Sequence, residues 1–284
     1  MIAHFPARDL WWLAAGGLGY GARYLQLRAR AARVTPPDAT GNLLRLQTLY
    51  GYNAHSLVSV ASGARAWTTP EIDGAVVYNE SGRVWLATGD PLADEQEASH
   101  LARQFIRAAQ QSGRIAAFVP TTSRFAESMA GVDLTTVKIG AAPYFDLKRW
   151  GPHGDRAKRL RAGLNQAKRA GVFIEAVETL EERLRGEAVG LCREWLRSRR
   201  TATSFGWLFT LDLFRHAAHK RFFTARDAEG RLLGLLAASP IPARSGWYLE
   251  DVLRRPDAPP GTADLLIVTA FRIWSCLRIN AVLK

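Results

Sequence analysis

The stretch VVYNESGRVWLA, residues 76–87, decides how the chain is interpreted, because residues 223–236, FTARDAEGRLLGLL, resemble it closely. Each stretch has apolar residues on both sides of a polar turn, and the Gly-Arg pairs that leave the two turns align. This is the pattern of a β-hairpin. Pro91 follows the first hairpin and Pro240 the second, where we expect turns. The repetition predicts a duplicated α/β unit, with a chance match of two common hairpins as the alternative.

Helix and strand patterns alternate around each hairpin. The segment after Pro91 has acidic residues in its first turns and a glycine beyond its end, which predicts a helix over 93–111. A capping box at Thr179 and Glu182 predicts a second helix that runs to Arg200. Further expected elements are a helix and loop over 41–60, strands at 74–79, 84–88, 115–119, 222–226 and 232–238, a short helix at 123–129 and an extended stretch at 134–147. The fold class is therefore α/β (α+β), with mixed sheets flanked by helices.

The length supports two units. The chain has 284 residues, which favours one large or two modest domains. We divide it into an N-terminal helical segment (1–40), a first unit (41–147), a basic connecting helix and strand (148–177) and a second unit (178–284).

The net charge is unusual. The chain has 38 Lys and Arg against 26 Asp and Glu, a net charge of +12, and only six of the basic residues are Lys. Arginine binds phosphate groups through two parallel hydrogen bonds, so the composition indicates a polyanionic partner. A genomic bias toward arginine codons is the alternative explanation for part of this excess.

The basic residues are concentrated in one segment. Between Lys148 and Arg169 there are eight basic residues and one acid, Asp155, so this stretch carries +7. Ala157, Leu160, Leu164 and Ala167 form one helical stripe, which leaves the cations on the exposed faces. A nearly uniform positive face favours phosphate binding over an ordinary solvated face. The candidate substrate-binding cations are Lys158, Arg159, Arg161, Lys168 and Arg169.

The sequence contains no motif for several common kinds of catalytic or metal site. Cys192 and Cys276 are far apart, so we expect neither a disulfide framework nor a cysteine zinc site. The six His include no HExxH pair, and His216 and His219 have no ligand pattern around them, so no metal is expected. No GxSxG, Walker or Rossmann pattern is present, which disfavours covalent catalysis and nucleotide hydrolysis.

The N-terminal stretch LWWLAAGGLGYGA, residues 10–22, is the most apolar run of the chain. It is shorter than the roughly 20 residues of a membrane-spanning helix and lacks the features of a signal peptide. Two interpretations stay open: a first helix of the fold, or an interfacial segment with Trp11, Trp12 and Tyr20 at the level of the lipid headgroups.

The segment from Trp247 onward contains the candidate chemistry. It predicts a strand that ends near Leu253, a proline-rich turn and a helix over 262–277. Strand alternation predicts that Leu249, Asp251 and Leu253 point one way while Glu250 and Val252 point the other. A carboxylate on an apolar strand is costly unless it is used or paired. Arg254 could form an ion pair with that carboxylate or bind a ligand phosphate. Asp264 lies in the first turn of the following helix, where the helix dipole stabilises a negative charge.

Together these residues resemble a known family. The motifs are Asp251-x-x-Arg254-Arg255 followed by Pro-Asp-Ala-Pro-x-Gly-x-x-Asp264, the short segments Lys138-Ile-Gly and Asp146-Leu, and the run Lys158-Arg-Leu-Arg-x-x-x-Asn165-x-Ala-Lys-Arg-x-Gly171. They resemble the catalytic C-terminal domain of phosphatidylglycerol lysyltransferases, also called multiple peptide resistance factors. The resemblance covers roughly residues 40–280.

The resemblance implies two tandem acetyltransferase-like (GNAT) units. Members of that family continue past the strand that begins at residues 279–284, where this chain stops, so the second unit is expected to lack its last strands. The resemblance also implies transfer of an amino acid from aminoacyl-tRNA to the hydroxyl of phosphatidylglycerol, with aminoacyl-tRNA as co-substrate and no cofactor. The implied catalytic residues are Asp251, Arg254 and Asp264, and Glu250, Arg255 and the basic helix are expected to bind substrate. The implied location is the inner face of a bacterial cytoplasmic membrane, with an anionic phospholipid surface and a separate flippase as partners.

Two other functions stay open. One is an acyl-CoA-dependent GNAT N-acyltransferase, although the Arg/Gln-x-x-Gly-x-Gly/Ala turn of that class is absent from residues 254–262. The other is a non-catalytic protein that binds RNA or an anionic membrane through Trp11, Trp12 and the arginine-rich helices.

Overall fold

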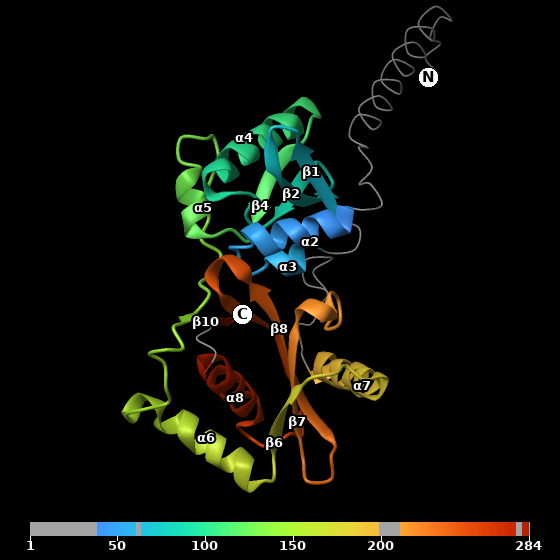
Figure 1. Cartoon of the computed structure of the whole chain (residues 1–284), viewed down its shortest axis with the longest axis vertical. Coiled ribbons are helices and arrows are strands. Elements are labelled where there is room, and N and C mark those ends of the chain that lie inside the picture. Colours follow the sequence, from blue (N-terminus) through green and yellow to red (C-terminus); the bar gives the residue numbers. More distant parts are fainter. Residues whose placement is uncertain (1–38, 61–63, 199–210, 277–279, 284) are drawn as a thin grey trace, which may run out of the picture.

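The chain forms two β-sheets with helices packed against them (Figure 1). The structure, a computed structural model, describes residues 39–60, 64–198, 211–276 and 280–283. The first sheet has four strands in the order β1-β2-β3-β4, and the second has six in the order β5-β10-β9-β8-β7-β6. The predicted class of mixed sheets flanked by helices is confirmed. The apolar stretch over 10–22 lies outside the described residues.

The first unit builds its sheet around one long helix. Its three antiparallel strands β1 to β3 are followed by the crossover helix α4, and β4 returns parallel to β3. Helix α4 is capped by Asp94, whose side chain accepts a hydrogen bond from Gln96 N, and it buries Phe105 against the sheet. The bounds are α2 Ala39–Tyr50, α3 Ser56–Ser59, β1 Arg65–Thr69, β2 Ile72–Ser81, β3 Val84–Thr88, α4 Glu95–Gln111, β4 Ile115–Val119 and α5 Ser123–Ser128.

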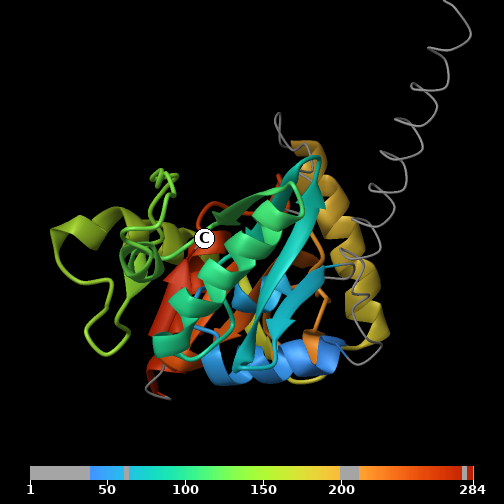
Figure 2. The ribbon, with the colours of Figure 1, turned by 90° about the horizontal axis from the view of Figure 1, so that it is seen from above.

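The second unit has helices on both faces of its sheet. Helix α7 packs on one face, and α8 packs on the other with the basic helix α6 outside it. Figure 2 shows α6 and α7 on opposite sides of the molecule. The bounds are β5 Tyr144–Phe145, η1 Asp155–Ala157, α6 Lys158–Arg169, β6 Phe173–Val177, α7 Glu182–Ser198, η3 Ala217–His219, β7 Arg221–Arg226, β8 Leu232–Ile241, η4 Pro242–Arg244, β9 Gly246–Arg254, α8 Thr262–Cys276 and β10 Asn280–Leu283.

The predicted alignment of the two hairpins is wrong by one strand. The hairpin β2–β3 leads directly into a crossover helix and a parallel strand, whereas β7–β8 is followed by another antiparallel strand, β9, before α8 and the parallel strand β10. The topological counterpart of β2–β3 is therefore β8–β9. Pro240 does not sit in a turn, because β8 continues through it and pairs it with Trp247. Both hairpins carry the same local turn signal, so sequence alone did not distinguish them.

The far side of the second sheet is closed by strands from distant parts of the chain. Strand β10 pairs parallel with β9 and antiparallel with β5, so the sheet does not stop at β9. In the stretch over 134–147, which was expected to be extended, only Tyr144 and Phe145 form a strand, and they belong to the second sheet. Strand β1 was not predicted, because its sequence RAWTT has no clear alternation.

A β-bulge in β9 overturns the predicted arrangement of its side chains. The register with β8 shifts between the pairs Ala237–Asp251 and Ala238–Leu249. A bulge inserts one residue into the alternation, so side chains beyond it change face. Leu249 therefore packs on the α8 face, whereas Leu253 packs on the α7 face. Glu250 bonds to Ser239 on the α7 face and so joins Asp251 there instead of opposing it.

Candidate active site

The two units meet where β8 and β9 contact the segment after α2. The side chains of Ile241 and Tyr248 form a small apolar cluster with Ala54 and Val58 of the first unit. Gln47 Nε2 donates to the Pro240 carbonyl oxygen across the same boundary at 3.3 Å. The α7 face of β9 therefore leads to a junction between the units, and the carboxylates displaced by the bulge lie on that face.

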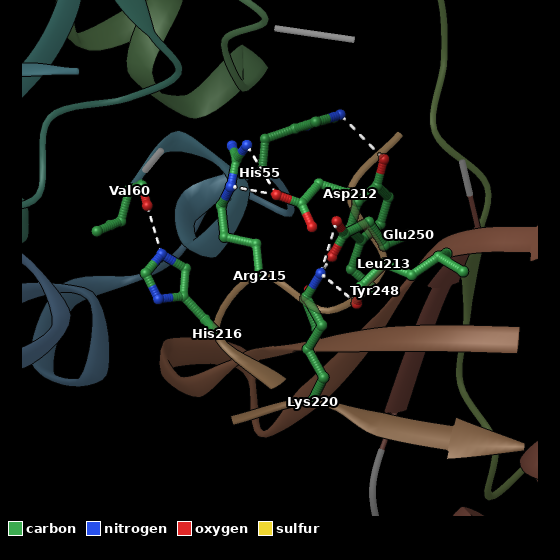
Figure 3. Close-up of polar contacts among 10 residues, drawn as sticks. His55, Val60, Asp212, Leu213, Arg215, His216, Lys220, Tyr248 and Glu250 are labelled. Atoms are coloured by element: carbon green, nitrogen blue, oxygen red, sulfur yellow. Dashed lines mark hydrogen bonds and ion pairs between the residues drawn. The ribbon is translucent and has the colours of Figure 1, made fainter. Parts of the chain in front are cut away.

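Glu250 is held in a buried polar cluster. Lys220 Nζ donates to Glu250 Oε1 at 2.9 Å, and Ser239 Oγ donates to the other carboxylate oxygen. The same ammonium donates to the Leu213 carbonyl oxygen at 3.3 Å (Figure 3). The side chains of Lys220 and Glu250 are only 2% and 11% exposed. Each charge is therefore compensated by the other, and removing either one would leave a buried, unpaired ion.

Tyr248 connects this cluster to the first unit. Its hydroxyl lies 3.0 Å from His55 Nε2, across the junction (Figure 3). Burial raises the pKa of the Tyr248 phenol, and the negative charges of Glu250 and Asp251 raise it further. The phenol therefore keeps its proton at neutral pH. A second histidine also joins the units: Nε2 of His216, in the second unit, is hydrogen-bonded to the Val60 carbonyl oxygen of the first.

Asp251 is half-buried beside helix α7. It lies opposite Ala237, which belongs to the apolar cluster under α7. Burial raises the pKa of the Cys192 thiol on α7 to about 11, and the Asp251 charge contributes to that rise. Cys192 is therefore a thiol at neutral pH, and a cysteine nucleophile is not available here. Asp251 is thus a half-buried acid on the α7 face of β9, next in sequence to Glu250.

The structure does not bring the three predicted catalytic residues together. Arg254 lies opposite Gly234, whose hydrogen faces Leu266 of α8, so Arg254 is on the other face of the sheet from Asp251. Its side chain is exposed. Asp264 is also exposed, in the first turn of α8, and its carboxylate lies beside Gly163 of α6. Residues three apart on a strand point to opposite faces, which separates Asp251 from Arg254.

The basic helix packs as its sequence stripe predicts. Leu164 and Ala167 are buried in the α8 cluster, and Leu160 packs against it. The side chains of Lys158, Arg159, Lys168 and Arg169 are exposed.

Arg161 and Arg255, which were predicted to bind substrate, are engaged within the protein. Arg161 donates to the carbonyl oxygens of Pro152 and Gly154 at 3.0 and 2.7 Å and so holds the loop before α6. Arg255 forms an ion pair with Glu194 of α7 and donates to the Leu232 carbonyl oxygen. Both guanidiniums therefore have structural partners.

The first unit also has a half-buried carboxylate, Asp90, directly after β3. It accepts hydrogen bonds from Thr122 N at 2.9 Å, Thr122 Oγ1 at 2.7 Å and Asn53 Nδ2 at 3.3 Å. Burial raises the pKa of Asp90, although these hydrogen bonds oppose the rise. All three donors are neutral, and they tie the loop after β3 to the start of α5.

Sequence reasoning missed most of the junction. Lys220, Ser239, Tyr248 and His55 were not singled out, because no local motif joins residues that are brought together by a bulge and a domain contact. One signal was available for Lys220, since the chain uses only six lysines and this one directly precedes an apolar strand.

Among the described residues, no three His, Cys, Asp or Glu side chains lie close enough to hold a metal ion. None of the helices described has the length and apolar character needed to cross a membrane.

Known proteins resemble this chain in sequence and in fold. The family model for the C-terminal region of phosphatidylglycerol lysyltransferase matches residues 46–284. Bifunctional lysylphosphatidylglycerol biosynthesis proteins from Nocardia farcinica and Mycobacterium tuberculosis are each 24% identical, over 200 and 209 residues. These regions are 70% and 69% of this chain but only 18% of each relative, so the chain spans about a fifth of their length.

Two solved structures share the fold. One is named as the C-terminal domain of a lysylphosphatidylglycerol synthetase from Agrobacterium fabrum, with a TM-score of 0.75 and 20% identity over 86% of this chain and 78% of that one. The other, named L-PGS from Bacillus licheniformis, has a TM-score of 0.72 and 17% identity over 88% and 75% of the two chains. At sequence identities of 20% and 17%, these two similarities establish a shared fold.

Proposed function

The chain belongs to the family of phosphatidylglycerol lysyltransferase C-terminal domains, and from this premise we propose that it moves an aminoacyl group from aminoacyl-tRNA to the hydroxyl of phosphatidylglycerol. Family membership supports aminoacyl-phospholipid synthesis in general. The tRNA donor, the lipid acceptor and the residues below are the proposal.

The observation that carries the proposal is the pair of carboxylates on the bulge of β9. Glu250 is neutralised by Lys220, and Asp251 lies beside it on the same face, next to the junction. Bulges occur often beside active sites, where they redirect a side chain. In this arrangement Glu250 and Lys220 fix the backbone of β9, and Asp251 is the acid that meets the substrate.

The reaction needs a base and an orienting site but no redox group. The ester that joins an amino acid to tRNA is already activated, so the acceptor hydroxyl attacks its carbonyl carbon once a base takes the hydroxyl proton. Asp251 accepts that proton. A new ester bond forms to the lipid oxygen, the bond to the ribose oxygen of the tRNA breaks, and the proton passes to that ribose oxygen. Tyr248 is buried and its hydroxyl lies 3.0 Å from His55 Nε2, so it positions β9 against the first unit rather than contacting the substrate.

The remaining predicted residues have supporting roles in this proposal. Lys158, Arg159, Lys168 and Arg169 present an exposed positive surface that suits tRNA phosphates. Arg254 lies on the α8 face, away from Asp251, and adds to this exposed positive charge. Asp264 is a carboxylate, which repels phosphate, and we give it no role in binding tRNA. We propose an anionic membrane surface as the lipid source and a separate flippase as the protein that moves the product onward.

Transfer of labelled amino acid tests the function. The protein is incubated with a pool of tRNA charged with labelled amino acids and with vesicles of phosphatidylglycerol and phosphatidylcholine. We expect label in the phosphatidylglycerol fraction, and none when the tRNA is first deacylated. If the chain is instead an acyl-CoA N-acyltransferase, acetyl-CoA will raise its melting temperature and acetylate small amines. Vesicle binding that is lost in salt, without a labelled lipid from any aminoacyl-tRNA, would overturn the proposal in favour of a non-catalytic binder.

A further inference from the structure

The segment over residues 135–144 is exposed along its whole length. It contains Lys138-Ile-Gly, a short motif to which the proposed function assigns no role. Residues 135–143 make no hydrogen bond to any described residue, and Tyr144 joins the second sheet at the start of β5. The side chains of the 135–144 segment are therefore available to a partner outside the chain.

Two large aliphatic side chains project from this segment. Val137 and Ile139 are each 70% exposed, the highest values among the large hydrophobic side chains that the structure describes. Single exposed apolar residues are common on protein surfaces. These two, however, flank one cation, Lys138, and the exposed ring of Tyr144 follows them. The 135–144 segment contains no acid, so apolar and positive groups alone face the solvent here.

This combination of side chains suits a lipid bilayer better than RNA. Surfaces that bind single-stranded RNA stack bases on aromatic rings, and valine and isoleucine have no such face. Aliphatic side chains instead enter the boundary between lipid headgroups and acyl chains. A lysine beside them reaches the lipid phosphates, and a tyrosine lies at headgroup level. Val137, Lys138, Ile139 and Tyr144 supply these groups within one short stretch.

The 135–144 segment lies on the positively charged side of the molecule. Figures 1 and 2 show the chain between α5 and α6 on the side of α6, away from α7. The exposed cations of α6 attract anions, but its apolar residues Leu164 and Ala167 are buried under it, so α6 offers charge without an apolar anchor. The 135–144 segment offers both, which is the combination that binds an anionic bilayer.

The end of the segment reaches the junction between the units. The ring centroid of Tyr144 lies 5.6 Å from the Cζ atom of Arg244, in the short helix η4 of the second unit. The neighbouring Ala243 N donates to the Gly51 carbonyl oxygen of the first unit at 3.4 Å. A surface that covers the 135–144 segment would therefore lie beside the place where the two units meet.

We propose that the 135–144 segment docks the protein on an anionic bilayer, with Val137 and Ile139 inserted among the lipids and Lys138 on their phosphates. This inference rests on the proposed function for the purpose of docking, which is to bring the junction close to the acceptor lipid. The docking itself rests on the exposure and the chemistry of the segment.

Insertion is tested with a local probe on the full chain. Ile139→Cys, made together with Cys276→Ser, is labelled with an environment-sensitive dye, and Val189→Cys on the exposed face of α7 is the matched control. The vesicles contain equal amounts of phosphatidylglycerol and phosphatidylcholine, with brominated acyl chains as quenchers. We expect the emission at position 139 to shift to the blue and to be quenched, and the emission at position 189 to stay unchanged. No quenching at position 139, or equal quenching at both positions, would overturn the proposal.

Vesicle flotation separates the apolar contribution from the charged one. Val137→Ser/Ile139→Ser removes the apolar contact, so the affinity for the mixed vesicles should fall about 10-fold or more, in low and in high salt alike. Lys138→Gln removes one contact with lipid phosphates, so the affinity should fall about five-fold in low salt. That loss should disappear in high salt and on vesicles of phosphatidylcholine alone, because it is electrostatic.

Helix α7 offers matched controls on the opposite side of the molecule. Val189→Ser/Leu196→Ser removes two exposed aliphatic side chains, and Arg193→Gln removes one exposed cation. Neither should change the affinity for vesicles. All of these variants keep the apolar stretch over 10–22, so the differences between them report the 135–144 segment alone.

These measurements do not depend on aminoacyl transfer. Insertion at position 139 without any labelled lipid would support docking while the proposed function fails its own test. Transfer at a normal rate without insertion would overturn the docking proposal and leave the proposed function standing. If Lys138→Gln weakens the binding of charged tRNA and leaves vesicle binding unchanged, the partner of the segment is RNA and the proposal is overturned.

Discussion

The strands β3 and β9 occupy the same place in their two units, and each carries a carboxylate in a different environment. Each strand leads through a crossover helix to a parallel neighbour. Asp90, after β3, is bonded only by neutral groups of its own unit. Glu250, on β9, is bonded by the buried cation Lys220 and lies beside Asp251 at the junction. Asp90 holds the loop after β3 in place. Glu250, by contrast, is positioned by the buried ammonium of Lys220.

This difference predicts where the chain tolerates change. A buried ion pair is weak evidence for stability, but breaking it by removing one partner is costly because the other charge is stranded. Removing the charge of a carboxylate that is bonded only by neutral donors, such as Asp90, lowers the free energy of unfolding by less. The bulge that turns Glu250 and Asp251 to one face has no counterpart at Asp90, which follows the end of its strand.

The largest effect is expected from Lys220→Met. It leaves Glu250 buried and unpaired, so the free energy of unfolding should fall by about 3–5 kcal/mol. Asp90→Asn in the first unit should cost only about 1–2 kcal/mol. Urea unfolding measures both. The double variant Lys220→Met/Glu250→Leu should recover much of the loss, and equal costs for Lys220→Met and Asp90→Asn would contradict the comparison.

Gly261→Ala should have the next largest effect. Gly261 has a φ of +86°, and an added Cβ would lie 2.1 Å from the Gly163 carbonyl oxygen of α6. Both the strain and the displacement of α6 reduce stability, by about 3 kcal/mol. Gly113 in the first unit is a matched control, because its φ is +68° but an added Cβ meets nothing within 4 Å. Gly113→Ala should therefore cost only about 1–2 kcal/mol.

A cost for Gly261→Ala no greater than that for Gly113→Ala would show that α6 is not held tightly against the turn before α8. The exposed cations of α6 would then have no fixed position relative to the second sheet.

The smallest effect is a difference in pH dependence between the units. Burial raises the pKa of Asp90, so the folded state binds its proton more readily, and stability relative to Asp90→Asn should increase as the pH falls toward the ordinary carboxyl range. Glu187 of α7 behaves oppositely, because its hydrogen bond to Arg226 lowers its pKa. The stability of the wild type relative to Glu187→Gln should therefore decrease over the same fall in pH. Urea unfolding at several pH values checks both, and slopes of the same sign would refute the assignment.

The fold could largely be predicted from the sequence, because strands, helices and caps leave local signals. The acid-rich start of α4 and the stripe of Leu160, Leu164 and Ala167 on α6 are examples. The junction could not be predicted, because its geometry depends on a one-residue bulge and on contacts between units. Strand alternation placed Glu250 opposite Asp251, and the bulge reverses this. Lys220 and His55 reach the site from loops far away in the sequence.

The most direct test is the single-turnover rate of aminoacyl transfer to phosphatidylglycerol for Asp251→Asn and Asp90→Asn. If Asp251 is the general base, its replacement should lower the rate by about 100-fold or more, because an amide cannot accept the proton. Asp90→Asn should transfer at nearly the wild-type rate, since that carboxylate bonds only within the first unit. Equal rates for the two variants, or a greater loss in Asp90→Asn, would contradict the assignment of the chemistry to the bulge of β9.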